Sequence, residues 1–357
     1  MAQFSDESRQ TNAGFVAPSQ SIRQFIKNGV IASDTPICST QIQPASLDLR
    51  LGLTACRVRA SFLPRTGATV AAKLRDLAMH EIDLSNGAVL ETGCVYVVPL
   101  LESVHLPKTV SAIANAKSSI GRLDVFTRLI TDQGEAFDHV QAGYSGPLYA
   151  EISPRAFSVL AHAGARLNQI RFHLKEQALG QPAPARAFPF SVDLEGRNGG
   201  PIGFRARPHS GLIDLNRVNH YDPAEFWDPI RPYRLGAGCG VILDPGAFYI
   251  LVSRESVKVE PNWAAEMTPY LAMVGEFRVH YAGFFDPGFG CSEVGGAGSR
   301  GVLEVRCHET PFALEHGQVI GKLIYEPMLA PPDILYGTDI GSTYQAQGLR
   351  LSKHFQA

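Results

Sequence analysis

The hydrophobic positions of this chain fall in short runs with Gly- and Pro-containing turns between them. Clear runs are residues 95–100, 148–152, 247–252 and 301–305. Short apolar runs between turn signals are typical of β-strands. Helical patterns are few, and we predict helices at residues 21–28, 117–126 and 262–274. The pattern therefore predicts an all-β protein with few short helices, built as a barrel or a jelly roll.

The pattern also repeats, because residues of the first half are matched 153 positions later in the second half. The matched residues of the first half are Leu90, Glu91, Gly93, Tyr96, Glu102, Ser103, Val104, Glu151, Gly164 and Phe172, and their counterparts are Leu243, Asp244, Gly246, Tyr249, Glu255, Ser256, Val257, Glu304, Gly317 and Tyr325. Chance does not maintain one constant offset over so long a stretch, so the sequence predicts a tandem duplication.

We therefore expect two domains, residues 1–180 and 181–357. A chain of 357 residues is long for one hydrophobic core and has ample length for two. The Pro-rich stretch 181–189 is typical of a stiff extended connector, and we place the boundary there. The segment from the connector to Pro232 has no counterpart in the first half and is assigned to the second domain.

Composition limits the classes of function. The net charge is −2, so no excess of basic residues attracts nucleic acid. No segment approaches the roughly 20 apolar residues that a membrane span needs, and the polar N-terminus does not have the pattern of a signal peptide. The six cysteines form no close pair, which favours reduced thiols and a cytoplasmic location.

Four motifs, in the correct order, resemble the dCTP deaminase family. Residues 43–52 (QPASLDLRLG) resemble its opening signature, and residues 117–123 (KSSIGRL) resemble its phosphate-binding segment. Residues 282–289 (AGFFDPGF) resemble its nucleoside-binding hairpin, and residues 336–348 (YGTDIGSTYQAQG) its closing tail. That family shares its fold with trimeric dUTPases. The resemblance therefore implies two dUTPase-like distorted β-barrels in tandem.

The phosphate segment offers suitable groups for a triphosphate. Lys117, Ser118 and Ser119 lie at a turn into a short helix, where hydroxyls, backbone N–H groups and one cation suit an anion. Taken alone, a Ser pair in this place is more often an ordinary helix cap beside a solvated lysine. Arg122 follows Ser118 by four residues and shares its helix face, as a surface ion-pairing arginine would. The resemblance implies that Ser118 and Arg122 are catalytic, and that Lys117 and Ser119 bind substrate.

The hairpin suits a pyrimidine deoxynucleoside. Backbone groups of a tight turn can pair with the base edge, and the resemblance assigns this role to the hairpin that contains Ala282 and Gly288. Asp286 suits the sugar 3′-hydroxyl. An aromatic at Phe284, Phe285 or Phe289 packed under the deoxyribose leaves no room for a 2′-hydroxyl. By itself, Asp-Pro-Gly is simply a good turn.

The closing tail adds further candidates. The resemblance implies that Tyr336, Tyr344 and Gln347 bind substrate. Thr343 stands where the family usually has a lysine, which weakens the expected grip on the phosphates.

Two glutamates fall at the position of the family's catalytic carboxylate. Glu151 and Glu304 each lie in an apolar strand, where burial raises the pKa of a carboxyl as proton transfer requires. Either glutamate alone could equally be an outward-facing surface residue. Because both halves keep theirs, we list both as catalytic candidates, and we predict Glu304 as the base because its own half has the intact hairpin.

The sequence argues against a catalytic metal. Zinc-dependent nucleobase deaminases carry His-x-Glu and Pro-Cys-x-x-Cys motifs, and this chain has neither. We expect no cofactor for the chemistry, and Mg²⁺ only as a companion of the triphosphate.

The two halves lack complementary parts. The first keeps Ser118, Ser119 and Arg122, but has Gln141-Ala142-Gly143 in place of Asp-Pro-Gly and has no closing tail. The second keeps the hairpin and tail, but residues 269–273 offer neither Ser nor Arg. In the family, each site lies between neighbouring barrels. We therefore expect self-association or pairing of the two domains within one chain to complete the site.

The resemblance implies hydrolytic deamination of dCTP to dUTP and ammonia, which supplies the precursor of dUMP for thymidylate synthesis. Two alternatives remain at this stage. One is dUTP diphosphatase activity, alone or coupled to deamination, and the other is a nucleotide-binding regulator whose chemistry has decayed.

Overall fold

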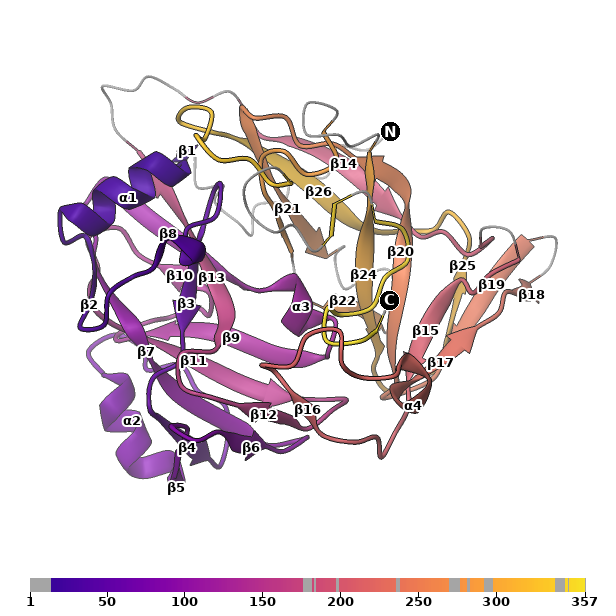
Figure 1. Cartoon of the computed structure of the whole chain (residues 1–357), viewed down its shortest axis with the longest axis horizontal. Coiled ribbons are helices and arrows are strands. Elements are labelled where there is room, and N and C mark those ends of the chain that lie inside the picture. The colour runs from indigo at the N-terminus through magenta and orange to yellow at the C-terminus, as the bar shows by residue number, and fades with distance from the viewer. Residues whose placement is uncertain are drawn as a thin grey trace.

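The computed structural model describes residues 14–175, 182, 184–196, 199–235, 238–269, 277–280, 283–291, 298–337, 344–345 and 347–356. Strands predominate in both halves, and the strands of the first half lie on the left of Figure 1 while most strands of the second half lie on the right. Within the described residues no helix is long and apolar enough to cross a membrane. All six cysteines are free, as predicted.

The first half contains two larger sheets and part of a small one. One sheet has the order β5 (Ala78–Asp83), β4 (Thr54–Val58), β7 (Val95–His105), β11 (Ser145–Pro154) and β9 (Val125–Thr131), with β2 (Ile31–Ser33) also paired to β7. The other has the order β1 (Phe15–Val16), β13 (Arg166–Leu174), β8 (Val110–Ala116) and β10 (His139–Val140), with β3 (Leu47–Arg50) also paired to β13. The small sheet joins β6 (Ala88–Leu90), β12 (Val159–Ala161) and β16 (Ile213–Asp214).

The second half has a similar set of sheets. One has the order β14 (Arg186–Ser191), β26 (Val319–Pro327), β21 (Trp263–Pro269) and β23 (Phe284–Phe285). Another has the order β17 (Trp227–Ile230), β15 (Gly203–Ala206), β20 (Phe248–Val257), β24 (Ser299–Cys307) and β22 (Phe277–His280). The third joins β18 (Tyr233–Leu235), β19 (Gly238–Leu243) and β25 (Phe312–Glu315).

Strand bounds repeat at the offset found in the sequence. Adding 153 to the bounds of β13 (166–174) gives 319–327, which are the bounds of β26, and adding 153 to β8 (110–116) gives 263–269, those of β21. The neighbour order β7–β11–β9 recurs as β20–β24–β22. The two halves thus share one strand arrangement, and their origin by tandem duplication stays a prediction.

The helices agree in part with the expected ones. Helix α1 (Ser19–Lys27) confirms the helix predicted at residues 21–28. Helix α3 (Ser118–Gly121) is shorter than the predicted 117–126, because Asp124 takes a left-handed φ of 54° and Val125 begins β9. The other helices are α2 (Val70–Leu77), α4 (Pro223–Phe226) and the 3₁₀ turn η1 (Ser39–Gln41), none of which the hydrophobic pattern predicted.

Two sequence-based predictions are wrong. The helix expected at 262–274 is the strand β21 over 263–269, and residues 270–274 lie outside the described part. Pairing of β21 with both β26 and β23 overrides the helix propensity of its Ala, Glu and Met residues. The connector expected at 181–189 belongs to β14 from Arg186 onward, an edge strand paired with β26 and therefore able to hold Pro189.

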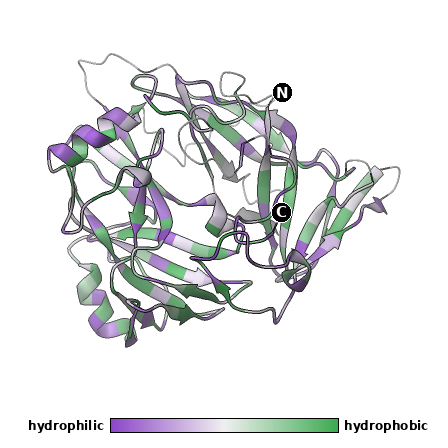
Figure 2. Cartoon of the chain, in the orientation of Figure 1, coloured by the Kyte–Doolittle hydropathy of each residue, from purple (hydrophilic) through white to green (hydrophobic). Residues whose placement is uncertain are grey.

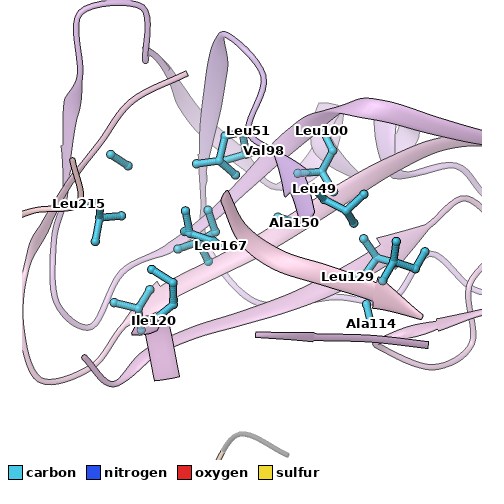
Figure 3. Packing of buried hydrophobic residues seen from close by; sticks show 14 of the residues in the cluster. Leu49, Leu51, Val98, Leu100, Ala114, Ile120, Leu129, Ala150, Leu167 and Leu215 are labelled. Carbon is cyan, nitrogen blue, oxygen red and sulfur yellow. The ribbon is translucent and has the colours of Figure 1, made fainter. Parts of the chain in front are cut away.

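The hydrophobic core continues across the two halves. The largest cluster of buried side chains fills the space between the sheets of the first half, as Figure 3 shows for Leu49, Val98 and Leu129. The same cluster also contains Leu215, Phe226 and Trp227 from the segment that has no counterpart in the first half. Hydrophobic and hydrophilic residues accordingly alternate along many of the strands (Figure 2). The unmatched segment, which the sequence analysis assigns to the second domain, thus packs against the first half.

Candidate active site

A cavity of about 320 Å³ is lined by residues of both halves, next to α3, which lies between the two groups of strands in Figure 1. From the first half the cavity is lined by Asp48, Lys117, Ser118, Ser119, Arg122 and Arg166, among others. From the second half it is lined by Phe285, Asp286, Glu304, Tyr336, Tyr344, Gln347 and Lys353, among others. One cavity therefore brings together the phosphate segment, the hairpin, the carboxylate of Glu304 and the tail.

The phosphate segment is a single helical turn between two strands. Lys117 is extended and its backbone N–H donates to the Leu167 carbonyl at 2.8 Å, which holds the start of the turn against β13. The turn ends at Arg122, and the reversal at Asp124 sends the chain into β9. The Lys117 ammonium forms an ion pair with the buried carboxylate of Asp48. The four candidate residues of this segment, Lys117, Ser118, Ser119 and Arg122, all line the cavity, and their roles stay predictions.

Arg122 is held in place by the tail of the second half. Its side chain is buried, and its two terminal nitrogens donate to the Gln347 side-chain oxygen and to the Arg350 carbonyl, each at 3.0 Å. The guanidinium carbon lies 3.8 Å from the ring centroid of Tyr344. Such stacking and fixed hydrogen bonds orient a planar cation with little freedom left to lose on binding. Arg122 is therefore a preorganised positive charge in the cavity wall.

Glu304 lies on β24, between β20 and β22, and is 5% exposed. Within the described part of the chain no donor is hydrogen-bonded to its carboxylate. Gly121 of α3 makes room for it, because a methyl group at Gly121 would lie 3.0 Å from Glu304 Oε2. Burial raises the pKa of Glu304 to about 8; the positive charge of Arg122 opposes this shift and the negative charge of Asp124 adds to it.

Glu151 occupies the equivalent strand position on β11, but it does not line the cavity. One of its carboxylate oxygens accepts from Arg128 Nε at 3.1 Å and forms an ion pair with the same guanidinium. The Arg128 guanidinium is in turn covered by the ring of Phe137, whose centroid is 3.5 Å from the guanidinium carbon. The structure thus brings Glu304, and not Glu151, to the phosphate segment.

The hairpin of the second half forms one wall of the cavity. Strand β23 pairs with β21, and the turn that follows is closed by the Phe289 N–H donating to the Asp286 carbonyl at 3.0 Å. Gly288 has a φ of 97°, and a Cβ there would lie 2.8 Å from the Tyr336 carbonyl oxygen, so only glycine fits. Ala282, predicted to bind substrate, lies outside the described residues.

Asp286 is buried and charged groups surround it. Its carboxylate lies 3.5 Å from a terminal nitrogen of Arg171, which is itself fully buried. Burial raises the pKa of Asp286, and the positive charge of Arg171 opposes this shift. Asp286 and Phe285 both line the cavity, and Arg171 forms an ion pair with the Asp286 carboxylate.

Described residues of the closing tail also line the cavity. The Tyr344 N–H donates to Tyr336 Oη at 3.2 Å, and the Tyr336 ring packs against Phe289 with centroids 5.6 Å apart. Gln347 holds Arg122, as described above. The three predicted tail residues Tyr336, Tyr344 and Gln347 therefore all reach the cavity, whereas Thr343 lies outside the described residues.

Sequence reasoning missed three charged residues of the cavity wall. Asp48 lies in the opening signature but was given no role there, and it receives the ion pair of Lys117. Arg166 lies on β13 and Lys353 lies beyond the tail motif, where no pattern in the sequence points to a site. Only the fold brings them to the phosphate segment.

Comparisons with known proteins agree with this geometry. Residues 13–176 match the family model described as the 2′-deoxycytidine 5′-triphosphate deaminase (DCD) N-terminal domain, and residues 165–355 match the model of the C-terminal domain. A crystal structure titled 2′-deoxycytidine 5′-triphosphate deaminase from Agrobacterium tumefaciens is similar over 90% of this chain and 100% of its own, with 49% identity and a TM-score of 0.82.

Curated relatives are similar over a shorter stretch. A protein of Sulfurihydrogenibium sp. named "dCTP deaminase, dUMP-forming" is 26% identical over 169 residues, which are 46% of this chain and 86% of the relative. A protein of the same name from Coprothermobacter proteolyticus is 28% identical over 144 residues, 39% of this chain and 72% of its own. The family models, which together span nearly the whole chain, and the cavity that joins its motifs show that this protein belongs to the dCTP deaminase family, with the dUTPase-like fold.

Proposed function

We propose that this chain hydrolyses dCTP to dUTP and ammonia, with Glu304 as the group that transfers protons. The observation that carries the proposal is the state of the Glu304 carboxyl. It lines the cavity beside Arg122, has no hydrogen-bond donor among the described residues, and has a pKa raised to about 8 by burial. A carboxyl whose pKa lies near the working pH can both accept and return a proton.

The proposed reaction uses one water molecule. Glu304 accepts a proton from water while the water oxygen bonds to C4 of cytosine. Glu304 then delivers this proton to N3. The proton of the new hydroxyl group passes through Glu304 to the amino group, the C4–N bond breaks, and ammonia leaves. The carbonyl at C4 and the proton at N3 complete the uracil ring, so dCTP and water give dUTP and ammonia.

Arg122 and Ser118 would position the water and stabilise charge as it develops. Arg122 needs no rearrangement to do so, because Gln347, Tyr344 and the Arg350 carbonyl already fix its guanidinium. Removing one preorganised donor of this kind typically costs about 10²–10³ in turnover. Lys117 and Ser119 would bind the phosphates, and Asp286 and Phe285 the deoxyribose.

We also propose that protein groups alone activate the water. The side chains available as metal ligands support this proposal, because the described residues contain no group of three or more His, Cys, Asp or Glu that could hold a metal ion. Mg²⁺ would accompany the triphosphate. After removal of all divalent ions with a chelator, Mg²⁺ alone should restore full turnover, and a requirement for Zn²⁺ would contradict the proposal.

A single chain would supply one complete site, which is supported by the lining of the cavity from both halves. Mixing two inactive variants tests this. Arg122→Ala removes the first-half contribution, and Glu304→Gln removes that of the second half. If each site is built within one chain, co-expressed variants stay inactive. If sites form between chains, a fraction of the assembled sites has both intact residues, and activity returns.

The identity of the product needs its own experiment, because the curated relatives are named as dUMP-forming. That name favours a second candidate, in which the same cavity also hydrolyses dUTP to dUMP and pyrophosphate. Incubation with dCTP, followed by separation of dUTP from dUMP and assays for ammonia and pyrophosphate, distinguishes the two. Ammonia with dUTP supports the proposal, and ammonia with equimolar dUMP and pyrophosphate supports the second candidate. Tight dCTP binding without ammonia would contradict both.

A further inference from the structure

The C-terminal end of the chain places a lysine in the cavity wall. Lys353 lines the cavity described above together with Asp48, Lys117 and Arg166, and we call these four residues the basic cluster. A second cavity of about 310 Å³ is lined by the same four residues, but not by Glu304, Phe285 or Asp286. The basic cluster therefore lies where the two cavities adjoin, and the proposed proton-transferring group lines only the first.

The charges of the basic cluster do not balance. Asp48 forms an ion pair with Lys117, and its Oδ2 is 3.8 Å from an Arg166 nitrogen, so one carboxylate serves two cations. Lys353 adds a third, and within the described part of the chain no acceptor is hydrogen-bonded to its ammonium. Burial lowers the pKa of Lys353, and the charges of Lys117 and Arg166 lower it further while Asp48 opposes them. A half-buried, unpaired ammonium is costly, and an anionic ligand would remove that cost.

The segment without a counterpart in the first half holds Lys353 in this position. The Asn219 N–H donates to the Lys353 carbonyl at 2.8 Å, and the His220 N–H donates to the His354 carbonyl at 2.9 Å. The ring of Phe355 packs edge-on against Phe226, with centroids 5.4 Å apart. We call residues 219–227 the socket, because they hold the end of the chain.

The other side of the tail is tied to the phosphate segment. Ser352 Oγ donates to the Ser119 carbonyl at 2.7 Å, and His354 Nδ1 lies 2.8 Å from the same Ser352 oxygen. The backbone N–H of Lys353 donates to Tyr344 Oη at 3.1 Å. Lys353 is thus fixed on both sides by hydrogen bonds of its neighbours, and its side chain is left to line the two cavities.

Resting on the proposed function, we propose that Lys353, positioned by the socket, binds the terminal phosphate of the nucleoside triphosphate. The base must reach Glu304, which lines only the first cavity, so the triphosphate extends toward the basic cluster at the junction with the second. Lys117 and Ser119 belong to the same junction and would bind phosphates nearer the sugar. Lys353 would then make the site select triphosphates over shorter nucleotides.

Lys353→Met tests the proposal, because it removes the charge and keeps the apolar stem. Loss of one charged hydrogen bond to an anion should raise KM for dCTP roughly 10- to 100-fold. The KM for dCMP, which lacks the terminal phosphate, should change less than about threefold, and kcat on dCTP should be retained. Lys353→Arg keeps a cation and should restore most of the affinity for dCTP. Lys27→Met, on the exposed end of α1, is the control for loss of one positive charge.

Two results would overturn the proposal. An equal rise in KM for dCTP and dCMP would mean that Lys353 only supports the tail. An unchanged KM for dCTP would mean that Lys353 does not touch the phosphates. If the wild-type protein releases no ammonia from dCTP, the proposed function fails on its own. Calorimetric titration with inorganic tripolyphosphate then still tests Lys353, since the wild type should bind it and a folded Lys353→Met variant should bind it at least 10-fold more weakly.

Discussion

Replacing Glu304 with Gln keeps the size of the side chain and removes its ability to accept a proton. Glu304 is 5% exposed and no donor among the described residues is hydrogen-bonded to its carboxyl, so the substitution disturbs few contacts. The change therefore isolates proton transfer from packing. It also removes a buried titratable group, which makes a second, thermodynamic effect measurable in the same variant.

The effect on turnover follows from the role of a general base. Proton transfer by a positioned group typically contributes about 10²–10⁴ to the rate, so ammonia release at saturating dCTP should fall by at least 10². That loss corresponds to roughly 3–5 kcal/mol of transition-state stabilisation. Affinity for dCTP should change little, because the amide still fits beside Gly121.

The effect on stability has the opposite sign. The pKa of Glu304 is about 8 in the folded protein and 4.5 ordinarily, so the folded state binds more protons than the unfolded state between these values. The free energy of unfolding of the wild type should fall as pH rises from 4.5 to 8, and this contribution should be constant outside that window. At pH 7 the burial of this carboxyl lowers the free energy of unfolding by about 3 kcal/mol. Glu304→Gln should recover much of this loss.

Glu151→Gln is the matched control. It removes a buried partner of Arg128 that does not line the cavity, so it should lower the free energy of unfolding and leave most of the turnover. Both variants can be compared for ammonia release at saturating dCTP, with circular dichroism and thermal melts over pH 5 to 8. Glu304→Gln should lose turnover and gain stability, whereas Glu151→Gln should keep most of its turnover and lose stability.

Glu304 is not the proton-transferring group if Glu151→Gln is the inactive variant, or if Glu304→Gln keeps wild-type turnover while folded. The first outcome would place the chemistry within the first half, or between first halves of different chains. The family membership would stand in either case. A melting temperature of Glu304→Gln that follows pH in the same way as the wild type would refute the raised pKa of Glu304.

Three further predictions concern the walls of the cavity. Gly121→Ala places a methyl group 3.0 Å from the Glu304 carboxylate, so kcat should fall at least 10-fold with little change in melting temperature. A normal kcat would show that Glu304 need not lie beside residue 121. Ser118→Ala and Arg122→Ala should each lower ammonia release by roughly 10²–10³, and wild-type turnover in a folded variant would remove that residue from the site. Asp286→Asn should mainly raise KM for dCTP, and the wild type should use CTP poorly; equal kcat/KM on CTP and dCTP would contradict the sugar assignment.

The sequence by itself determined those features that depend on neighbouring residues. The strand runs at residues 95–100 and 148–152 lie in β7 and β11, because alternation and turn residues act locally. The constant offset of 153 is visible again in the strand bounds. The motifs also contain Ser118 and Arg122, which line the cavity, since each motif is short and contiguous. The roles assigned to these two residues and to Glu304 stay predictions.

The tertiary structure alone decided which groups meet. Local propensity favoured a helix over residues 262–274, but pairing with β26 and β23 makes residues 263–269 a strand. Glu151 and Glu304 have equivalent strand positions, and only packing shows that Arg128 binds one carboxylate while the other lies beside Arg122. Lys353 reaches the cavity because the socket holds the end of the chain, more than 120 residues farther along the sequence. Such contacts join segments far apart in the chain, so they depend on the packing of the whole fold, which no local pattern records.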